Sequence, residues 1–260
     1  MTINNYFSNV NSNLRKLKKM QFEQVSKDQV HVLNMLLQNI SEVAERKVYL
    51  EGLGNFYDCL KSDASYFIDE RDYNIYSILE VGGQQWLGEN LRYEVKKSAV
   101  NPSNPSIEYG RLYTWDGMFE ACPPGWHLPS DKEWNDLEEA FGVAQKEVGR
   151  SAWRGKHGLE MKSTSGWPLG HDGTNSFGFN VYPAGAVYRL DTFSWLGEDA
   201  YFWSSTTGLW PSMDDPHGYA WCRRLHSTAD GVYRDIRDKS HGHSCRCIKD
   251  VKVVYDRINE

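Results

Sequence analysis

The sequence predicts an α+β fold, with two helices and many short strands around an aromatic core, preceded by a separate helical region. Composition supports this division, because all ten Trp lie between Trp86 and Trp221 and all nine Pro lie at or after Pro102. Helical spacing of apolar residues before residue 73 gives way to short runs and turns after it. We therefore expect a helical region over 1–72 and a second domain over 73–260.

The totals exclude several protein classes. At 260 residues and 40% hydrophobic content, the chain can bury a real core. A net charge of −6 gives no general reason to expect nucleic-acid binding. The sequence has no apolar run long enough to span a membrane and no signal peptide. Five Cys fit a disulfide framework poorly, so we expect reduced thiols, with one bridge possible in an oxidising location.

The first region reads as helical. No Gly or Pro occurs from Asn13 to Leu50, and Glu51–Gly54 ends the helix before a second short one over Phe56–Phe67. Two interpretations stay open, an amphipathic helix packed on the domain and an oligomerisation or attachment stem. The second rests on a short heptad pattern at Leu33, Leu36, Ile40 and Val43.

In the second domain, turn and cap signals locate the elements. Gly82-Gly83 separates two apolar runs and predicts a hairpin. Tyr113–Ala121 is expected to be a short helix. Ser130 and Glu133 form a capping box that starts a second helix, and Gly142 ends it. Further β-like runs are Phe177–Tyr182, Ala200–Ser204, Gly218–Trp221, Gly231–Ile236 and Ser244–Val251.

Motifs for chemistry are sparse. The sequence has no G-x-S-x-G elbow, Walker A loop or G-x-G-x-x-G, so we predict no enzyme and no catalytic residue. His241-Gly242-His243 is a weak chelation signal, and the thiols of Cys245 and Cys247 should point to one face of a strand and be buried. We expect no metal or cofactor, except that calcium is possible at Asp214-Asp215 or the 170–173 loop.

Several longer motifs together closely resemble the Fibrobacter succinogenes major paralogous domain over about residues 73–250. They are W-L-G-E-N-L-R-Y (86–93), Y-G-R-L-Y-T-W (109–115), A-C-P-P-G-W-H-L-P-S (121–130), G-T-N-S (173–176), A-Y-F-W-S-S (200–205) and R-C (246–247). The resemblance implies a C-type lectin-like fold related to that of formylglycine-generating enzyme, without a catalytic cysteine pair in a matching context. Cys122 and Cys247 fall at family motif positions and could pair in an oxidising location.

A narrower resemblance concerns residues 220–250, which resemble the variable region of proteins diversified by a retroelement through adenine-randomised Asn codons. The fixed points of that pattern are matched by Ala220, Trp221, Arg223, Leu225, Val232, Arg234, Lys239, Gly242, Ser244, Arg246, Cys247, Lys249 and Asp250. The residues at the Asn points include no Lys, Glu, Gln, Met or Trp, which NNC codons do not encode. Departures at Ser227, Asp230, His243 and Cys245 fall where the pattern has no Asn.

This resemblance implies a variable region over about 220–243 that forms a shallow, exposed binding patch. The implied ligand-binding residues are Cys222, Arg224, His226, Ser227, Thr228, Ala229, Gly231, Tyr233, Asp235, Ile236, Arg237, Asp238, Ser240 and His241. The implied scaffold residues are Trp203, Trp221, Leu225, Val232 and Cys247. Diversifying side chains on a rigid scaffold changes a binding surface without unfolding it.

The predicted function is therefore a hypervariable ligand- or receptor-binding protein, with a protein or glycan ligand on a cell surface. The alternatives are an undiversified structural or adhesin domain, and an oxidase or hydrolase related to formylglycine-generating enzyme, for which Cys222 and Cys245 are loose candidates. A homo-oligomer through the N-terminal helices is possible, and no nucleic-acid partner is expected. Location is open among a phage virion, the cytoplasm before assembly and a cell surface.

Overall fold

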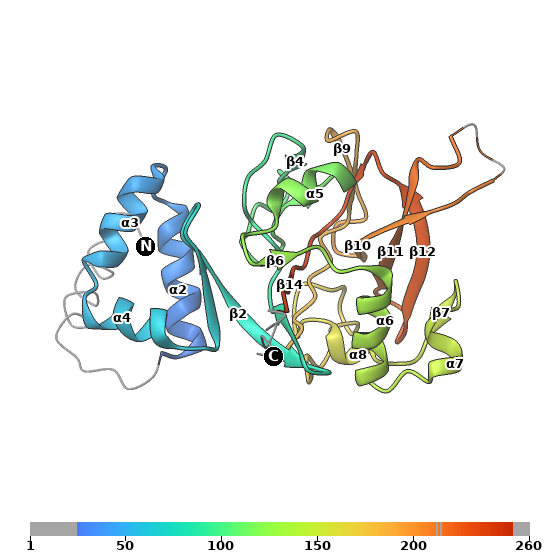
Figure 1. Cartoon of the computed structure of the whole chain (residues 1–260), viewed down its shortest axis with the longest axis horizontal. Helices are drawn as coiled ribbons and strands as arrows, with labels where there is room; N and C mark the ends of the chain where they lie inside the picture. The colour runs from blue at the N-terminus through green and yellow to red at the C-terminus, as the bar shows by residue number, and fades with distance from the viewer. Residues whose placement is uncertain (1–24, 212, 214, 252–260) are drawn as a thin grey trace, which may run out of the picture. The chain divides into compact units, whose positions relative to one another are not determined.

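The computed structural model describes residues 25–211, 213 and 215–251. The chain divides into two compact units, Met1–Ile78 and Leu79–Glu260, and Figure 1 shows the elements of each. The sequence placed this division at residue 73, whereas the units divide within strand β2 (Asn74–Val81). Each unit has its own hydrophobic core and is described by itself.

The first unit contains helices α2 (Lys27–Gln38), α3 (Val43–Glu51) and α4 (Asn55–Ser62), then strand β1 (Tyr66–Asp69) paired with β2. A capping box between Ser26 and Gln29 starts α2. The Asn34 side chain pairs with the backbone of Ile75 through both its amide nitrogen, at 2.8 Å, and its oxygen, at 3.0 Å. This pairing holds α2 against β2.

Two predictions for this region were wrong. The expected continuous helix is broken at Asn39, which caps α2, and the part of it before residue 25 lies outside the described residues. Phe67 lies in β1 because α4 ends at Asp63, whose backbone is extended. Most residues of the heptad pattern are taken up by the packing of the unit itself. Leu33 joins its core, and Val43 is the exception, at 40% exposed. That stripe is therefore not a free oligomerisation face.

In the second unit, the hairpin and the two predicted helices are confirmed. Gly82 and Gly83 have φ of 57° and 75°, the left-handed conformation of a tight hairpin turn, between β2 and β3 (Gln84–Leu87). Helix α5 covers Trp115–Ala121, and α6 covers Asp131–Ala140 with its capping box formed by Ser130 and Glu133. The short helices α7 (Gln145–Val148) and α8 (Gly158–Met161) were not predicted.

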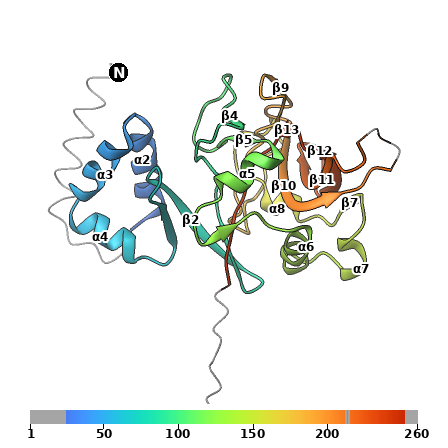
Figure 2. The same ribbon diagram turned by 45° about the horizontal axis from the view of Figure 1, so that its top comes forward.

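The strands of this unit form several small antiparallel sheets. A four-stranded set, in the order β10 (Asp199–Gly208), β11 (Tyr219–His226), β12 (Val232–Asp238) and β7 (Trp153–Arg154), lies near α6 and α7 in Figure 2. A second set is β13 (His241–Gly242), β8 (Ala186–Tyr188) and β9 (Thr192–Ser194). The others are β3–β14–β6, with β14 at Ile248–Lys249 and β6 at Trp126–His127, and β4 (Ser98–Ala99) with β5 (Leu112–Tyr113).

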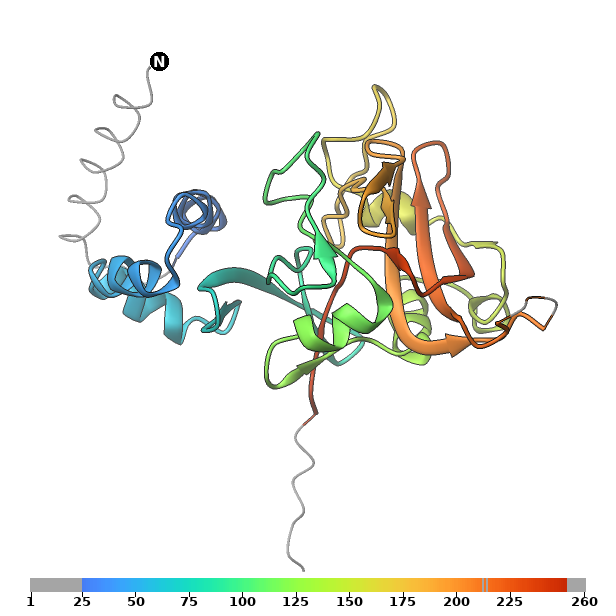
Figure 3. The ribbon, with the colours of Figure 1, turned by 90° about the horizontal axis from the view of Figure 1, so that it is seen from above.

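The main core lies between α6 and one face of the β10–β11–β12 sheet. Trp134 and Leu137 of α6 pack with Phe202 of β10, Leu225 of β11 and Val232 of β12, all at most 1% exposed. The Trp134 indole N–H also donates to the Trp203 carbonyl oxygen at 3.1 Å. The loop between β10 and β11, which carries Trp210, projects from the ends of these strands in Figure 3.

The α+β class is thus confirmed, with two corrections to the strands. Phe177–Tyr182 is not a strand, because Gly178 and Asn180 have positive φ and interrupt the extended run. Of the predicted run over 244–251, only β14 is a regular strand. None of the helices in the described part of the chain has the length and apolarity needed to cross a membrane.

Candidate ligand-binding site

Alternation along β11 separates its side chains between the two faces of the sheet. Arg223 and Leu225 point toward α6 and the core, because Arg223 bonds residues of α6 and Leu225 joins the core cluster. The register pairs Arg224 with Tyr201 on β10 and Tyr233 on β12, so these three share the opposite face. We call these faces the core face and the pocket face.

The pocket face borders a cavity of about 440 Å³. Half of its lining comes from the predicted variable region, namely Arg224, Ile236, Arg237, Asp238 and His241. The other half is aromatic and lies outside that region, namely Tyr188, Trp195, Tyr201, Trp210 and Tyr219. The site therefore joins part of the predicted variable region to aromatic side chains that the sequence did not assign to it.

Arg224 is a fixed cation in this pocket. Its guanidinium donates two hydrogen bonds to the carboxylate of Asp199, Nε to Oδ1 at 2.8 Å and Nη2 to Oδ2 at 3.0 Å. Burial lowers the pKa of Arg224, but the hydrogen bonds to Asp199 and the charges of Asp199, Tyr201 and Asp235 together outweigh it, so the pKa is raised. The guanidinium also lies 5.6 Å from the centre of the Tyr201 ring. This bidentate pair orients Arg224 and leaves its outer edge toward the pocket.

The remaining charges of the pocket are less constrained. Arg237 pairs with Asp235 through Nη1 and Oδ2 at 2.5 Å, and their side chains are 30% and 21% exposed. Burial lowers the pKa of His241 below its ordinary value of 6.5, so its imidazole is neutral at pH 7. The His241 ring meets Tyr188 edge to face, with centroids 4.3 Å apart. The pocket thus offers cations, a neutral imidazole and several aromatic rings to a ligand.

A second, more open hollow adjoins the first. It has a volume of about 620 Å³, shares Asp238 with the pocket, and is lined by charged residues that include Lys97, Arg189 and Lys239. Two of its lining residues, Asp238 and Ser240, belong to the predicted variable set. The concave surface around β12 therefore extends beyond the aromatic pocket.

The other predicted ligand-binding residues do not line the pocket. His226, Thr228 and Ala229 lie at the β11–β12 turn, at the far end of β11 from Tyr219, and are partly or fully exposed. Tyr233 packs on Trp153 of β7, with ring centroids 5.2 Å apart. The structure brings together one part of the predicted set and spreads the rest along the sheet.

Three predicted contact residues are buried, which corrects the expectation of an exposed patch. They are Cys222, Ser227 and Gly231, of which Cys222 is 0% exposed and Ser227 is 8% exposed. At Gly231 a Cβ atom would lie 2.6 Å from the carbonyl oxygen of Arg154, so no larger residue fits without a backbone shift. Cys222 has the same strand parity as Arg224, and Ser227 and Gly231 lie between β11 and β12, so the segments packed over these residues, and not strand alternation, decide their burial.

The core face carries a buried ionic network that the sequence did not predict. The Arg223 guanidinium donates to Glu138 Oε1 at 2.5 Å and to Asp131 Oδ1 at 2.7 Å. Arg234 on β12 donates to Asp131 Oδ2 at 2.7 Å, and Arg154 on β7 donates to Glu138 Oε1 at 2.7 Å. These contacts tie three neighbouring strands to α6. Arg223 and Arg234 both match fixed points of the pattern that residues 220–250 resemble.

Most of the predicted scaffold residues are buried. Trp203, Leu225, Val232 and Cys247 are at most 1% exposed, whereas Trp221 is only partly buried and lies under the guanidinium of Arg234, 3.4 Å from its ring centre. Arg246 was missed as a scaffold residue. It is 0% exposed, donates to Asn90 Oδ1 at 2.9 Å and lies over the ring of Phe179. The sequence did carry a signal for Arg223, Arg234 and Arg246, because each matches a fixed point of the pattern that residues 220–250 resemble.

The weak metal signals from the sequence gain no support. The rings of His241 and His243 are 6.2 Å apart, and His243 is stacked on Tyr201 and Trp203 instead. Asp214 lies outside the described residues. Asp172 accepts a hydrogen bond from the backbone of Trp167. Within the described ranges, the group of side chains that could hold a metal consists of Cys122, Cys245 and Cys247.

The candidate catalytic thiols are poorly suited to catalysis. Burial raises the pKa of Cys222 to about 12 and raises the pKa of Cys245 as well, so both are protonated at neutral pH. A protonated, enclosed thiol is a weak nucleophile. Cys122 and Cys247 form a disulfide, the pairing that the family motifs made possible.

Comparison with known proteins adds one finding. The model of the Fibrobacter succinogenes major domain matches residues 79–249, from the first residue of the second unit to the end of β14. The match includes every residue that lines the pocket. The comparisons with curated proteins and with solved structures gave no match.

Proposed function

The chain belongs to the Fibrobacter succinogenes major domain family, and from this premise we propose that its second unit is a ligand-binding module. The module has a C-type lectin-like fold and is diversified by a retroelement over about residues 220–243. It has no catalytic role. Its ligand is a protein or glycan presented on a cell surface, and the pocket face is the surface that binds it.

The observation that carries this proposal is the way in which the two residue classes separate on β11 and β12. Fixed points such as Arg223, Leu225 and Arg234 lie on the core face, whereas departing positions such as Arg224 and Arg237 line the pocket. Variation confined to the pocket face would change recognition without disturbing the core. That is the arrangement a diversified binding protein requires.

The chemistry of the pocket favours protein or glycan recognition. Aromatic and arginine side chains dominate binding energy at many interfaces, and Tyr188, Trp195 and Tyr201 stand beside Arg224 and Arg237 here. A hollow of about 440 Å³ has the volume of an ordinary small-ligand site. It would hold one side chain or one sugar ring, with the adjoining hollow available for the rest of the ligand.

The first unit has a role of its own in this proposal. We propose that it attaches the binding module to a larger assembly or to further copies of the chain. Val32, Met35 and Val48 are exposed apolar residues of α2 and α3, between 41% and 68% exposed, and would supply the contact. Sedimentation of the full chain and of a Val48→Glu variant tests this, because an equal mass for both would argue against such a contact.

The test of the main proposal is sequence variation at the locus within one population. We expect excess substitutions at the codons of Arg224, Arg237 and His241, and none above background at Arg223 and Arg234. Arg223 and Arg224 form a matched pair, because they are adjacent residues of the same type. Equal variation at the two codons, or none at either, would remove the basis for diversification.

Binding itself needs a separate test. A library randomised at Arg224, Ile236, Arg237, Asp238 and His241 should yield binders to unrelated protein and glycan targets. A control library of the same size at five exposed positions away from the pocket should not. Similar yields from both libraries would contradict the pocket as the binding surface.

A further inference from the structure

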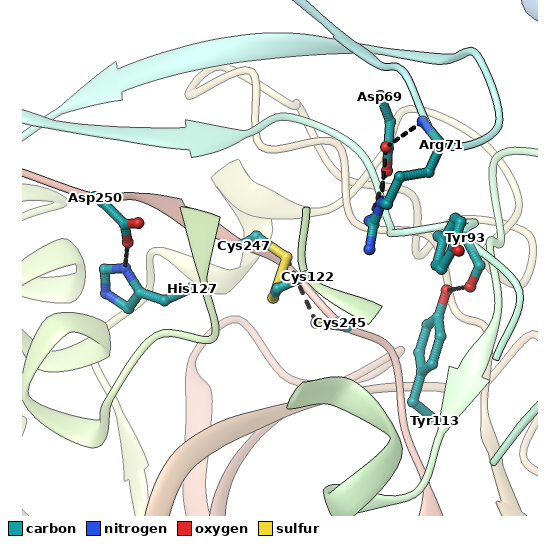
Figure 4. Close-up of a disulfide and its surroundings, with 9 residues drawn as sticks. All are labelled: Asp69, Arg71, Tyr93, Tyr113, Cys122, His127, Cys245, Cys247 and Asp250. Carbon is teal, nitrogen blue, oxygen red and sulfur yellow. Dashed lines mark hydrogen bonds and ion pairs between the residues drawn. A yellow bond between two sulfur atoms is a disulfide. The ribbon is translucent and has the colours of Figure 1, made fainter. Parts of the chain in front are cut away.

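Three cysteine sulfurs converge at the end of α5. Cys122 caps this helix, and Cys245 and Cys247 flank Arg246 in the segment that leads into β14. Figure 4 shows the Cys122–Cys247 disulfide with Cys245 beside it. The Sγ atoms of Cys245 and Cys247 are 3.9 Å apart, and all three Sγ atoms lie within 4.8 Å of one another.

The disulfide leaves the third cysteine unexplained. Cys245 is a free cysteine, is 0% exposed and is held as close to the bridge as sulfur atoms in contact. The free cysteine Cys222 on β11 is equally buried but has no other cysteine beside it. A buried cysteine in this fold therefore does not need to lie next to the disulfide, as Cys245 does.

We propose that Cys122, Cys245 and Cys247 form a thiolate site for a divalent cation of the zinc class when the Cys122–Cys247 bridge is reduced. In a tetrahedral zinc site each Zn–S bond is about 2.3 Å, which places pairs of sulfurs about 3.8 Å apart. The Cys245–Cys247 separation of 3.9 Å already matches this value. Cys122 is only half-buried, so water could supply the fourth ligand from its side.

The surroundings can balance the charge of such a site. Three thiolates and one divalent cation carry a net charge of −1. Arg246 lies between the two strand cysteines in sequence, is 0% exposed, and is held by Asn90 and by the carbonyl oxygen of Leu87. Arginine carries a positive charge in proteins at neutral pH. The guanidinium of Arg246 therefore offsets the negative charge of the site.

The bridge and the metal exclude each other. Two equivalents of a low-molecular-weight thiol reduce the disulfide, giving the thiols of Cys122 and Cys247 and one equivalent of the small-molecule disulfide. The cation then displaces one proton from each of the three thiols, forming three metal–sulfur bonds. A small-molecule disulfide reverses this: it takes two electrons from the thiolates of Cys122 and Cys247, which re-form their bond, and with two protons it becomes two small thiols. The cation leaves, and Cys245 takes up the third proton. The same residues thus hold this edge of the fold together in either redox state.

The experiment is a titration of the full chain with cobalt(II) as a spectroscopic probe of a zinc site. The chain is reduced with excess small thiol, freed of thiol and metal without oxygen, and titrated at pH 7. We expect one cobalt per chain with intense sulfur-to-metal absorption, and about three protons released per cobalt. Zinc should displace the cobalt and abolish the absorption. The oxidised chain should show neither binding nor proton release.

Matched variants locate the site. Cys245→Ser should weaken cobalt binding by at least about tenfold, and its fold can be checked first in the oxidised form, which keeps the disulfide. Cys222→Ser removes an equally buried thiol outside the cluster and should bind cobalt as the original chain does. Cys122→Ser, at the half-buried position, provides a second test if Cys245→Ser does not fold. Absence of sulfur-to-metal absorption in the reduced original chain, or full binding by Cys245→Ser, would overturn the proposal.

Discussion

Arg223 and Arg224 are neighbours on β11, yet their surroundings are opposite. Arg223 is 0% exposed and is enclosed by the carboxylates of Glu138 and Asp131. Arg224 is 27% exposed and borders the pocket. Successive side chains of a strand point to opposite faces. One strand can therefore hold the fold together with every second residue, while the residues between them line a pocket.

The largest expected effect comes from opening the core-face network. Arg223→Ala leaves two carboxylates of α6 without their shared cation, and should lower the free energy of unfolding by about 3–5 kcal/mol. Arg237→Ala, which breaks a partly exposed pair on the pocket face, should cost about 1 kcal/mol or less. Urea unfolding of both variants measures the difference, and equal losses would mean that the two faces do not differ in this way.

A smaller effect is expected at Gly231, a position where the retroelement pattern allows change. A methyl group there would meet the carbonyl oxygen of Arg154 at 2.6 Å, so Gly231→Ala should lower the free energy of unfolding by about 1–3 kcal/mol. Gly149→Ala is the control, because a Cβ atom at Gly149 meets no atom within 4 Å. If thermal unfolding of Gly231→Ala and of the control coincide, Gly231 belongs with the freely variable positions.

A pH-dependent effect is expected at His243, which follows β13 and stacks on Tyr201 and Trp203 of β10. Burial, with the nearby charges of His241 and Arg237, lowers the pKa of His243 well below its ordinary value of 6.5. The unfolded state then binds more protons than the folded state below pH 6.5. The stability that depends on neutral His243 is therefore complete above pH 6.5 and falls as the pH decreases, by up to about 1.4 kcal/mol per pH unit.

His243→Phe should flatten this pH dependence, because phenylalanine keeps the stacking with Tyr201 and Trp203 but does not titrate. His241 still contributes in the same direction, so a shallower slope remains. Free energies of unfolding between pH 7 and pH 5 measure it. The exposed His217, changed to Asn, is the control. An unchanged slope in His243→Phe would show that the buried imidazole is not the responsible group.

The smallest stability effect is expected for a carboxylate of the pocket face. Asp238 lines both hollows, and Asp238→Ala should change the free energy of unfolding by about 0.5 kcal/mol or less. Glu138→Ala removes a carboxylate of the core face that is 0% exposed, and should cost about 3 kcal/mol or more. Chemical unfolding compares them. A large loss for Asp238→Ala would place it among the scaffold residues.

Local signals in the sequence predicted many elements correctly. The Ser130 and Glu133 capping box, the Gly82-Gly83 turn and the runs that became β10, β11 and β12 all depend on residues close together in the chain. The predictions failed where distant residues decide the conformation. The run over 177–182 is apolar enough for a strand, but Gly178 and Asn180 have positive φ and break the extended backbone, while Phe177 and Val181 donate hydrogen bonds to carbonyl oxygens of α8.

The sequence by itself determined the family, the α+β class and the runs that form β10, β11 and β12. Only the tertiary structure decided which of the remaining residues can meet a ligand. Tyr188 and Trp195, far from the predicted variable region in sequence, join Arg224 and His241 around one pocket, while Cys222 and Gly231 are enclosed. The reason is physical, because burial and convergence depend on contacts between segments that no local pattern records.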